Sequence, residues 1–376
     1  MKTTTSFRVN LCLFTVLLAG CAAPKVSTTK RNPPLEISSD QQDSIVVMTY
    51  NVENLFDTVD DDDRNDETFL PIEKKQNEAH KELCRKNNGT NERYLKECLE
   101  FDWSEELLSL KVNRIAEVIL SVNDGNGPDV LIVEEVENIN ALRILNRALG
   151  DKAYPTEVLL EGPDVRGIDV GMLSRFPLKN AELHAIPLVE YDLASRPTRS
   201  ILQADYELPG GDILTAFGVH FPSPGHKNSE RVLAFSVLKE AFHHLPDNRM
   251  VVAGGDFNIT SENDDKTNII DFEMGRDFMA SHKVGCGDCQ GTSYFHYTDE
   301  KYRWSFLDII FASNNMEPGK ATAPYELDKS SIFVAKDVAF QSDNRGQPQR
   351  FFSWEWDAPR GVSDHWPVVL TLVKKR

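Results

Sequence analysis

Side chains of the types that bind divalent metals and move protons occur in six short clusters spread along the chain. Each cluster follows an apolar, β-branched run, so each is expected at the end of a buried strand. An α/β scaffold assembles a site from such strand ends. Carboxylates, amide oxygens and imidazoles gathered in this way favour hydrolysis of a phosphoester. The clusters are centred on Asn51, Glu135, His220, Asp256 with Asn258, Asp308, and Asp364 with His365.

The elements that must position these side chains are strands mixed with helices. Apolar residues near helical spacing predict helices over residues 103–122, 138–149 and 229–243. Residues 166–173 and 199–206 are predicted as strands without a long helix between them. A purely parallel sheet needs a crossover helix between each pair of strands. The sequence therefore predicts mixed sheets.

The chain begins with a pattern typical of a secretory signal peptide, in which basic residues precede an apolar stretch too short to span a bilayer. Leu18-Ala19-Gly20-Cys21 resembles the lipobox of bacterial lipoproteins. This resemblance implies a signal peptide over residues 1–20 and a lipid anchor on Cys21. With Ala22 next, it also implies the outer membrane of a Gram-negative bacterium, on its periplasmic or surface face. The alternative is an ordinary signal peptide with an incidental cysteine.

Residues 21–43 are rich in Ser, Thr, Pro and Lys without apolar periodicity, and are predicted to form a flexible tether. Residues 44–376 are more than one simple core usually holds, so they form either two domains or one domain with several layers. No Pro/Gly/Ser linker interrupts them, and the polar clusters run through their whole length. We therefore predict one domain.

The formal net charge is −18, from 59 acidic and 41 basic side chains. This balance argues against tight binding of a polyanion through a broad basic face. A bound metal ion can still supply local positive charge beside a phosphate. If nucleic acid is involved, it is expected as a substrate and not as a tightly held ligand.

Four cysteines lie in the body of the chain, and an exported protein with four cysteines is expected to form two disulfides. Proximity in the sequence favours Cys84 with Cys98 and Cys286 with Cys289, although other pairings are open. A zinc site built from all four is the competing interpretation.

The polar residues 57–103, which include Cys84 and Cys98, are predicted to be an insertion. Within it, residues 57–66 are strongly acidic, and we predict a solvated loop there. An additional Ca²⁺ site is the alternative, although the EF-hand spacing is absent.

Five separated segments, in this order, resemble the successive motifs of the endonuclease/exonuclease/phosphatase superfamily. The resemblance covers about residues 44–373 and implies a four-layer α/β sandwich, in which two mixed β-sheets pack face to face with helices outside. It also implies a cleft at one end. The segments are Thr49-Tyr50-Asn51-Val52-Glu53-Asn54-Leu55-Phe56, Val133-Glu134-Glu135-Val136-Glu137-Asn138, Gly254-Gly255-Asp256-Phe257-Asn258, Trp304-Ser305-Phe306-Leu307-Asp308-Ile309-Ile310 and Ser363-Asp364-His365-Trp366-Pro367.

The resemblance also implies a metal site. Glu135 would be the main ligand with Asn51 beside it, and Asp364 would lie at the same ion or a second one. The ion would be Mg²⁺ or Mn²⁺, which take oxygen ligands. Many relatives have Gln where this chain has Glu134, and the extra acid would either face solvent or add to the metal site.

Catalytic roles are implied for five further residues. Asp256 would orient or deprotonate the attacking water, and Asn258 would hold a phosphate oxygen. His365, supported by Asp308, would donate to the phosphate, because a carboxylate behind an imidazole raises its pKa. His220 would act as general acid.

Phosphate binding is implied for three positions. Arg199 and Arg166 carry donors suited to a phosphate, although pairing with a nearby acid is the alternative, above all for Arg166. Ser223 takes the place of a phosphate-contacting Asn in some relatives. Residues 350–356 form an aromatic run before Asp364, and either stack on bases, enter a lipid interface, or form a partly buried hairpin.

The leading functional hypothesis is an exported, lipid-anchored, metal-dependent phosphodiester hydrolase that cleaves nucleic acid by in-line attack of water. The segments 136–138 and 166–170 look most like those of bacterial extracellular nucleases. The alternative is a phosphomonoesterase or a phospholipid-headgroup phosphodiesterase, similar to inositol phosphatases or sphingomyelinases. A more remote alternative is a non-catalytic binding lipoprotein. No protein partner is predicted, and a monomer is expected.

Overall fold

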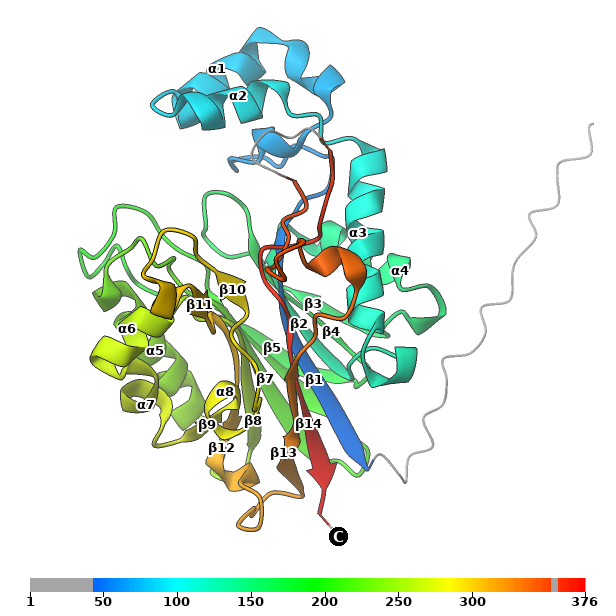
Figure 1. The fold of residues 1–376 in the computed structure, drawn as a ribbon, viewed down its shortest axis with the longest axis vertical. Helices are drawn as coiled ribbons and strands as arrows, with labels where there is room; N and C mark the ends of the chain where they lie inside the picture. The colour runs from blue at the N-terminus through cyan, green and yellow to red at the C-terminus, as the bar shows by residue number, and fades with distance from the viewer. Residues whose placement is uncertain (1–42, 353–357, 376) are drawn as a thin grey trace, which may run out of the picture. The chain divides into compact units, whose positions relative to one another are not determined.

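The computed structural model of the protein describes residues 43–352 and 358–375 (Figure 1). The predicted signal peptide, the lipid anchor at Cys21 and nearly all of the tether lie outside these residues, as do residues 353–357 of the aromatic run. Within the described ranges, no helix is both long enough and apolar enough to cross a membrane.

The first sheet has six strands in the order β13-β14-β1-β2-β4-β3. Strands β1 and β2 are parallel, and the other neighbours are antiparallel. The parallel pair is central, so two polar strand ends lie side by side at one edge. The strands are β1 (Ser44–Leu55), β2 (Val130–Val136), β3 (Thr156–Leu159), β4 (Asp169–Ser174), β13 (Tyr325–Val334) and β14 (Val368–Lys374).

The second sheet repeats this plan in the order β5-β6-β7-β8-β12-β9, with β7 and β8 as its parallel pair. A separate two-stranded ribbon consists of β10 (Ser293–Tyr294) and β11 (Trp304–Ser305). The strands of the second sheet are β5 (Leu178–His184), β6 (Ile201–Glu207), β7 (Ile213–His220), β8 (Met250–Asp256), β9 (Phe278–Ala280) and β12 (Asp308–Ser313).

The two sheets pack face to face around a large buried apolar cluster. Two glycines allow the second sheet to approach the first. A Cβ added at Gly218 would lie 2.5 Å from Val170, and one added at Gly254 would lie 2.8 Å from Ile132. Any larger side chain at either position would force the sheets apart.

Helices cover the outer faces of both sheets (Figure 1). Helices α3 (Glu105–Leu120) and α4 (Ile139–Ala148) pack on the first sheet. Helices α5 (Asn228–His243) and α7 (Ile269–Met274) pack on the second. The predicted four-layer sandwich with two mixed sheets is thus confirmed. The remaining short helices are α6 (Ser261–Thr267), α8 (Ser281–Val284) and the 3-10 turns Asn123–Gly125, Gly150–Lys152, Glu300–Tyr302, Asn314–Met316 and Ala339–Gln341.

The segment predicted as an insertion forms two antiparallel helices, α1 (Glu78–Asn88) and α2 (Glu92–Glu100), after the 3-10 turns Glu67–Phe69 and Ile72–Gln76. The helices stand beyond the strand ends that carry the polar clusters (Figure 1). A disulfide between Cys84 and Cys98 links them.

Both predicted disulfides, Cys84–Cys98 and Cys286–Cys289, are confirmed. The alternative of a zinc site built from all four cysteines is wrong, because every one of these sulfurs is bonded to another. The prediction of a solvated acidic loop is also wrong in part, since Asp57 and Asp66 are buried. Asp57 accepts a hydrogen bond from Asn140, and Asp66 accepts one from the backbone of Asp61.

Candidate active site

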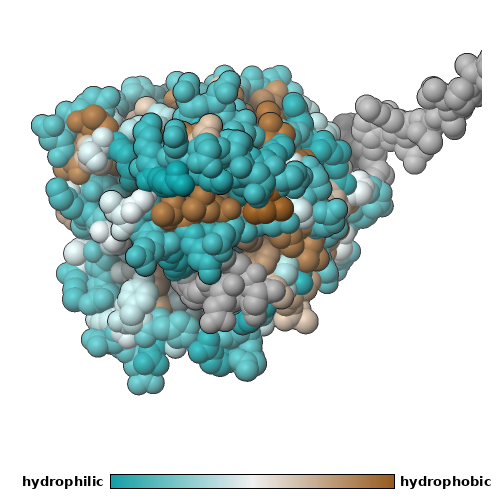
Figure 2. Space-filling view, turned by 90° about the horizontal axis from the view of Figure 1, so that it is seen from above, coloured by the Kyte–Doolittle hydropathy of each residue, from teal (hydrophilic) through white to brown (hydrophobic). Residues whose placement is uncertain are grey.

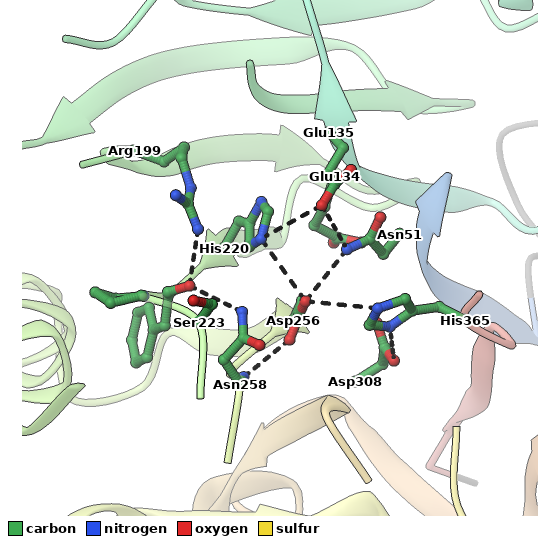
Figure 3. Close-up of polar contacts among 12 residues, drawn as sticks. Asn51, Glu134, Glu135, Arg199, His220, Ser223, Asp256, Asn258, Asp308 and His365 are labelled. Carbon is green, nitrogen blue, oxygen red and sulfur yellow. Dashed lines mark hydrogen bonds and ion pairs between the residues drawn. The ribbon is translucent and has the colours of Figure 1, made fainter. Parts of the chain in front are cut away.

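The polar ends of the two parallel strand pairs meet at one end of the sandwich. In the first sheet, Asn51 lies opposite Glu134 on the neighbouring strand. In the second sheet, His220 pairs in register with Asp256, and Asp256 pairs with Asp308. The sheets face each other, so the two sets of side chains form one cluster (Figure 3). Asn51 links them, because its Nδ2 donates to Asp256 Oδ2 (3.2 Å).

Glu134 and Glu135 point to different places because the strand bulges between them. The register of β2 against β4 shifts after Glu134, and Glu135 has a φ of 63°. Positive φ is uncommon for a residue with a side chain and is typical of functional sites. The turn directs Glu135 into the cluster, where its Oε1 is 3.4 Å from Asn51 Nδ2.

Glu134 is fully buried beneath the cluster and accepts a hydrogen bond from Thr49 Oγ1 (2.7 Å). The alternative that this extra acid faces solvent is therefore wrong. Burial, with a contribution from the Asp308 carboxylate, raises the pKa of Glu134 well above its ordinary value. A carboxyl held neutral in this way is a buried structural group beside the other carboxylates of the cluster.

The acidic cluster fits a hard divalent cation. Burial is the main cause that raises the pKa of Asp256 to about 7; His365 opposes the rise, and the carboxylates of Asp308 and Glu135 add to it. Asp308 Oδ1 is buried without a hydrogen-bond partner. Carboxylate oxygens that repel one another are stabilised by a cation, and Mg²⁺ and Mn²⁺ prefer oxygen ligands.

Asp364 lies at the rim of this cluster, in a charge pair. Its Oδ2 accepts from Arg350 at 2.6 Å, and its Oδ1 is 4.0 Å from His365 Nε2. Although burial opposes the change, Arg350 lowers the pKa of Asp364. Arg350 thus contacts one of the two carboxylate oxygens of Asp364. A role for Asp364 as a metal ligand stays a prediction.

The predicted contact between His365 and Asp308 is confirmed. His365 Nδ1 is 2.8 Å from Asp308 Oδ2, and the Asp308 side chain is fully buried. Burial alone would lower the pKa of His365, but Asp308 and then Asp256 outweigh it and raise that pKa well above its ordinary value. The ring can therefore carry positive charge toward a phosphate oxygen at neutral pH.

His220 lies between the carboxylates of Glu135 (3.8 Å) and Asp256 (3.7 Å). Even so, burial and then Arg199 lower the pKa of His220 well below its ordinary value. A neutral ring can donate one N–H to an oxygen, but it is poorly suited to deliver a proton as an imidazolium. The role of general acid at His220 stays a prediction, and the charge state does not favour it.

The predicted phosphate-binding arginines both pair with one acid. Asp164 lies 3.4 Å from Arg199 and 3.6 Å from Arg166. Arg199 is buried and also donates to the carbonyl of Phe221 (2.8 Å), which accepts from Asn258 Nδ2 as well (2.9 Å) (Figure 3). The acid-pairing alternative therefore describes both arginines, and Arg199 contacts the site through Phe221.

Ser223 is exposed, and its carbonyl accepts from Arg231 (2.8 Å). Figure 3 places it beside Asn258 at the margin of the cluster. A phosphate contact at Ser223 stays a prediction.

The sequence profile described as the Endonuclease/Exonuclease/phosphatase family matches residues 46–91 and 84–374. This chain belongs to that family. Family members are metal-dependent phosphoesterases, and the chain is an enzyme of this class. No curated protein sequence matches it.

Solved structures of the same fold include TDP2 from D. rerio in complex with single strand DNA product, with a TM-score of 0.51, 15% identity and coverage of 88% of this chain and 98% of that chain. An endonuclease/exonuclease/phosphatase from Beutenbergia cavernae has a TM-score of 0.51, 16% identity and coverage of 89% and 72%. A family protein from Bacteroides thetaiotaomicron has a TM-score of 0.50, 14% identity and coverage of 89% and 98%.

Three charged residues that sequence reasoning did not assign to the site hold its surrounding segments together, namely Glu53, Lys111 and Arg350. Arg350 forms ion pairs with both Asp364 and Glu53, and its Nε lies 2.7 Å from Glu53 Oε1. Lys111 is buried on α3 and donates to the carbonyls of Glu53 (2.8 Å) and Val362 (2.9 Å). Lys111 shares the buried face of α3 with apolar residues such as Leu108. The spacing of three residues between Leu108 and Lys111 could have indicated that Lys111 lies on the buried face of the helix.

A cleft of about 620 Å³ opens over the catalytic cluster. Glu135, Asp364 and His365 form part of its lining, and residues of α1 and α2 form another part. The segment predicted as an insertion thus forms a wall of this cleft. The lining contains five basic residues, Arg93, Lys111, Arg166, Arg196 and Arg350, against four acidic ones, Glu53, Glu97, Glu135 and Asp364.

Proposed function

We propose that this phosphoesterase is an exported nuclease that hydrolyses phosphodiester bonds of nucleic acid by in-line attack of water. The observation that carries the proposal is the composition of the cleft. In a chain of net charge −18, the cleft gathers five basic side chains and also aromatic ones beside the cluster that would handle the phosphate. Basic and aromatic residues in one groove are the combination that binds single-stranded nucleic acid. TDP2 from D. rerio, which has this fold, was crystallised with a single strand DNA product.

The cluster suggests a division of labour among its residues. Glu135 and Asn51 would hold the divalent cation, for which we propose Mg²⁺ or Mn²⁺. When bound, such an ion polarises the phosphoryl oxygen and offsets the charge that develops on it. Asp256 would accept a proton from the attacking water, since a carboxylate with a pKa of about 7 is matched to that task at neutral pH.

The remaining residues would act on the phosphate oxygens. His365, held in place by Asp308, would donate from Nε2 to a non-bridging oxygen. His220 would donate the N–H of its neutral ring. Asn258 already donates to the Phe221 carbonyl, and its second N–H would hold a phosphate oxygen. His365 and Asn258 are each fixed by a buried partner before substrate arrives, which is the arrangement that stabilises developing charge.

The location of the enzyme is part of the proposal. The lipobox-like segment supports cleavage before Cys21, acylation of Cys21 and attachment to the outer membrane of a Gram-negative bacterium. Residues 44–376 would then form one catalytic domain on a tether of residues 21–43. The two disulfides agree with an oxidising compartment. We further propose that the enzyme acts as a monomer and holds nucleic acid only as substrate.

A small phosphoester, either a phosphomonoester or a phospholipid headgroup, is the second candidate substrate. Two observations favour it, namely the acidic charge of the whole chain and the cleft volume of about 620 Å³. That volume is typical of a small-ligand site. A compact substrate would need no long basic groove.

The test is cleavage of plasmid DNA and of a single-stranded oligonucleotide by the protein made in an oxidising compartment. Mg²⁺ is compared with EDTA, and the wild type with His365→Ala. Cleavage that needs both the metal and His365 would support the nuclease. If folded protein cleaves neither substrate but releases phosphate or headgroup from small esters, the second candidate replaces it.

A further inference from the structure

The helix pair α1–α2 lies outside the four layers and contributes little to their core. Its buried residues are His80, Cys84 and Cys98. A disulfide and the contact between His80 Nε2 and the Cys98 carbonyl oxygen (3.1 Å), and not apolar packing, therefore hold the two helices together. A segment that contributes so little to the core is free to serve as a binding surface.

One face of this helix pair lines the catalytic cleft. Asn87 and Asn88 at the end of α1, and Arg93 and Tyr94 in the first turn of α2, belong to the same cavity wall as His365. Helix α2 begins in the cleft because Asn91 caps it, accepting hydrogen bonds from the backbone of Arg93 and Tyr94. The cap thereby fixes the backbone from which the Tyr94 side chain projects.

Tyr94 is an exposed aromatic residue in this wall, since 49% of its surface is accessible. The guanidinium of Arg93 lies 5.7 Å from the centre of its ring. Phe101 and Phe352 lie deeper in the same cleft with their rings 5.1 Å apart. Figure 2 shows an apolar band bordered by polar side chains at this end of the molecule. An exposed aromatic ring beside basic residues is a stacking platform for a base.

We propose that the disulfide-linked pair α1–α2 is a substrate-binding wall, in which Tyr94 stacks on an unpaired nucleobase of the strand whose phosphate is cleaved. This inference rests on the proposed nuclease function and adds the form of the substrate. A ring can stack on a base only where the base exposes its face, so the wall selects single-stranded or end-frayed nucleic acid. The cleft has the volume of a small-ligand site, which also disfavours a continuous duplex.

The experiment measures kcat/KM of wild type, Tyr94→Ala and Tyr94→Phe on a single-stranded oligonucleotide and on bis(p-nitrophenyl) phosphate, which has no base. Tyr297→Ala is the matched control, because Tyr297 is also an exposed tyrosine and does not line the cleft. We expect Tyr94→Ala to lower kcat/KM on the oligonucleotide by about 5- to 160-fold, the loss for one base–aromatic stack. Its turnover of the small ester should be unchanged, and Tyr94→Phe should retain activity on both.

A second substrate identifies the contact. In a series of oligonucleotides, one base at a time is removed next to the cleavage point. At the stacked position, the abasic substrate should react slowly with wild type, and the further effect of Tyr94→Ala should disappear. Binding of the labelled oligonucleotide in EDTA, followed by fluorescence anisotropy, should weaken in Tyr94→Ala in the same way.

Failure of this inference and failure of the nuclease proposal give different results. If wild type cleaves the oligonucleotide and Tyr94→Ala cleaves and binds it equally well, the stacking wall is wrong while the nuclease stands. If the small ester is hydrolysed and no oligonucleotide is cleaved, the nuclease proposal fails and the stacking wall fails with it. An equal loss in Tyr94→Ala on both substrates would show a general disturbance of the site and would also overturn the inference.

Discussion

Substituting Asp308 by Asn removes the charge behind His365 without changing the shape of the side chain. Asp308 Oδ2 lies 2.8 Å from His365 Nδ1, and the Asp308 side chain is fully buried, so water cannot replace the lost contact. The amide can offer the ring a neutral hydrogen bond but cannot stabilise an imidazolium. His365 would then face the phosphate as a neutral ring.

The expected magnitudes follow from that geometry. A positioned proton donor contributes ~10²–10⁴-fold to a rate, so we expect kcat to fall by that factor in Asp308→Asn. A hydrogen bond to a charged group contributes about 1.5–3 kcal/mol, which sets the upper limit of the lost stability. The net loss should be smaller, because the Asp308 carboxylate also raises the pKa of Asp256 and of Glu134. Removing its charge relieves both repulsions.

The assay is steady-state hydrolysis of bis(p-nitrophenyl) phosphate, with urea denaturation as the measure of stability. Asp205→Asn is the matched control, because Asp205 pairs with Arg249 (3.3 Å) and accepts from Thr215 (2.6 Å), near the other end of the same sheet. It should lower stability without changing kcat. If Asp308→Asn kept the wild-type kcat, or if Asp205→Asn lost as much activity, the role assigned to the pair of Asp308 and His365 would be wrong.

Three further predictions concern the supports of the site. Lys111→Met should lower kcat, and it should lower the free energy of unfolding in urea by about 2–5 kcal/mol, because two buried carbonyls lose their donor. The control Lys179→Met, at an exposed lysine, should change neither quantity. Replacing Cys84 and Cys98 by Ser should destabilise the helix pair by about 3 kcal/mol, which is the loop-closure entropy expected for a disulfide that closes a loop of this size. Limited proteolysis of the variant should then cut within residues 78–100. A variant that is not cut there would contradict this prediction. Burial raises the pKa of Asp66 from 3.8 to about 6, so the stability that its protonated form contributes is present below pH 4 and is lost as pH rises through 6. Asp66→Asn should make the fall in melting temperature between pH 4 and 7 less steep, and an unchanged pH profile would refute this.

The fold and the centre of the site were largely predictable, because their signals are local. Alternation and helical spacing placed α3, α4 and α5 to within two residues of their ends. The polar residue after each apolar run placed the cluster from Asn51 to His365. Proximity in the sequence gave both disulfides. The strands predicted at residues 166 and 199 begin later, at Asp169 and Ile201, since the preceding arginines turn toward Asp164.

Side-chain partners from distant segments were not predictable. The burial of Glu134 depends on Thr49, 85 positions away, and the role of Lys111 depends on a carbonyl 251 positions away. Nothing near Arg199 in the sequence indicates that it forms an ion pair with Asp164. Such contacts depend on which surfaces the sheets bring together, and no short segment carries that information.

The sequence alone determined the family, the chemistry and the order of the strand ends, because residue type and short-range periodicity specify them. The sequence favoured Glu135 as the acid that enters the site, but only the tertiary structure decided that Glu134 is buried beneath the cluster, since a single bulge reverses the direction of a side chain. Only the tertiary structure placed the insertion as a wall of the cleft. Both outcomes depend on packing between segments far apart in the chain. In another strand register, the side chains that now form the site would face solvent.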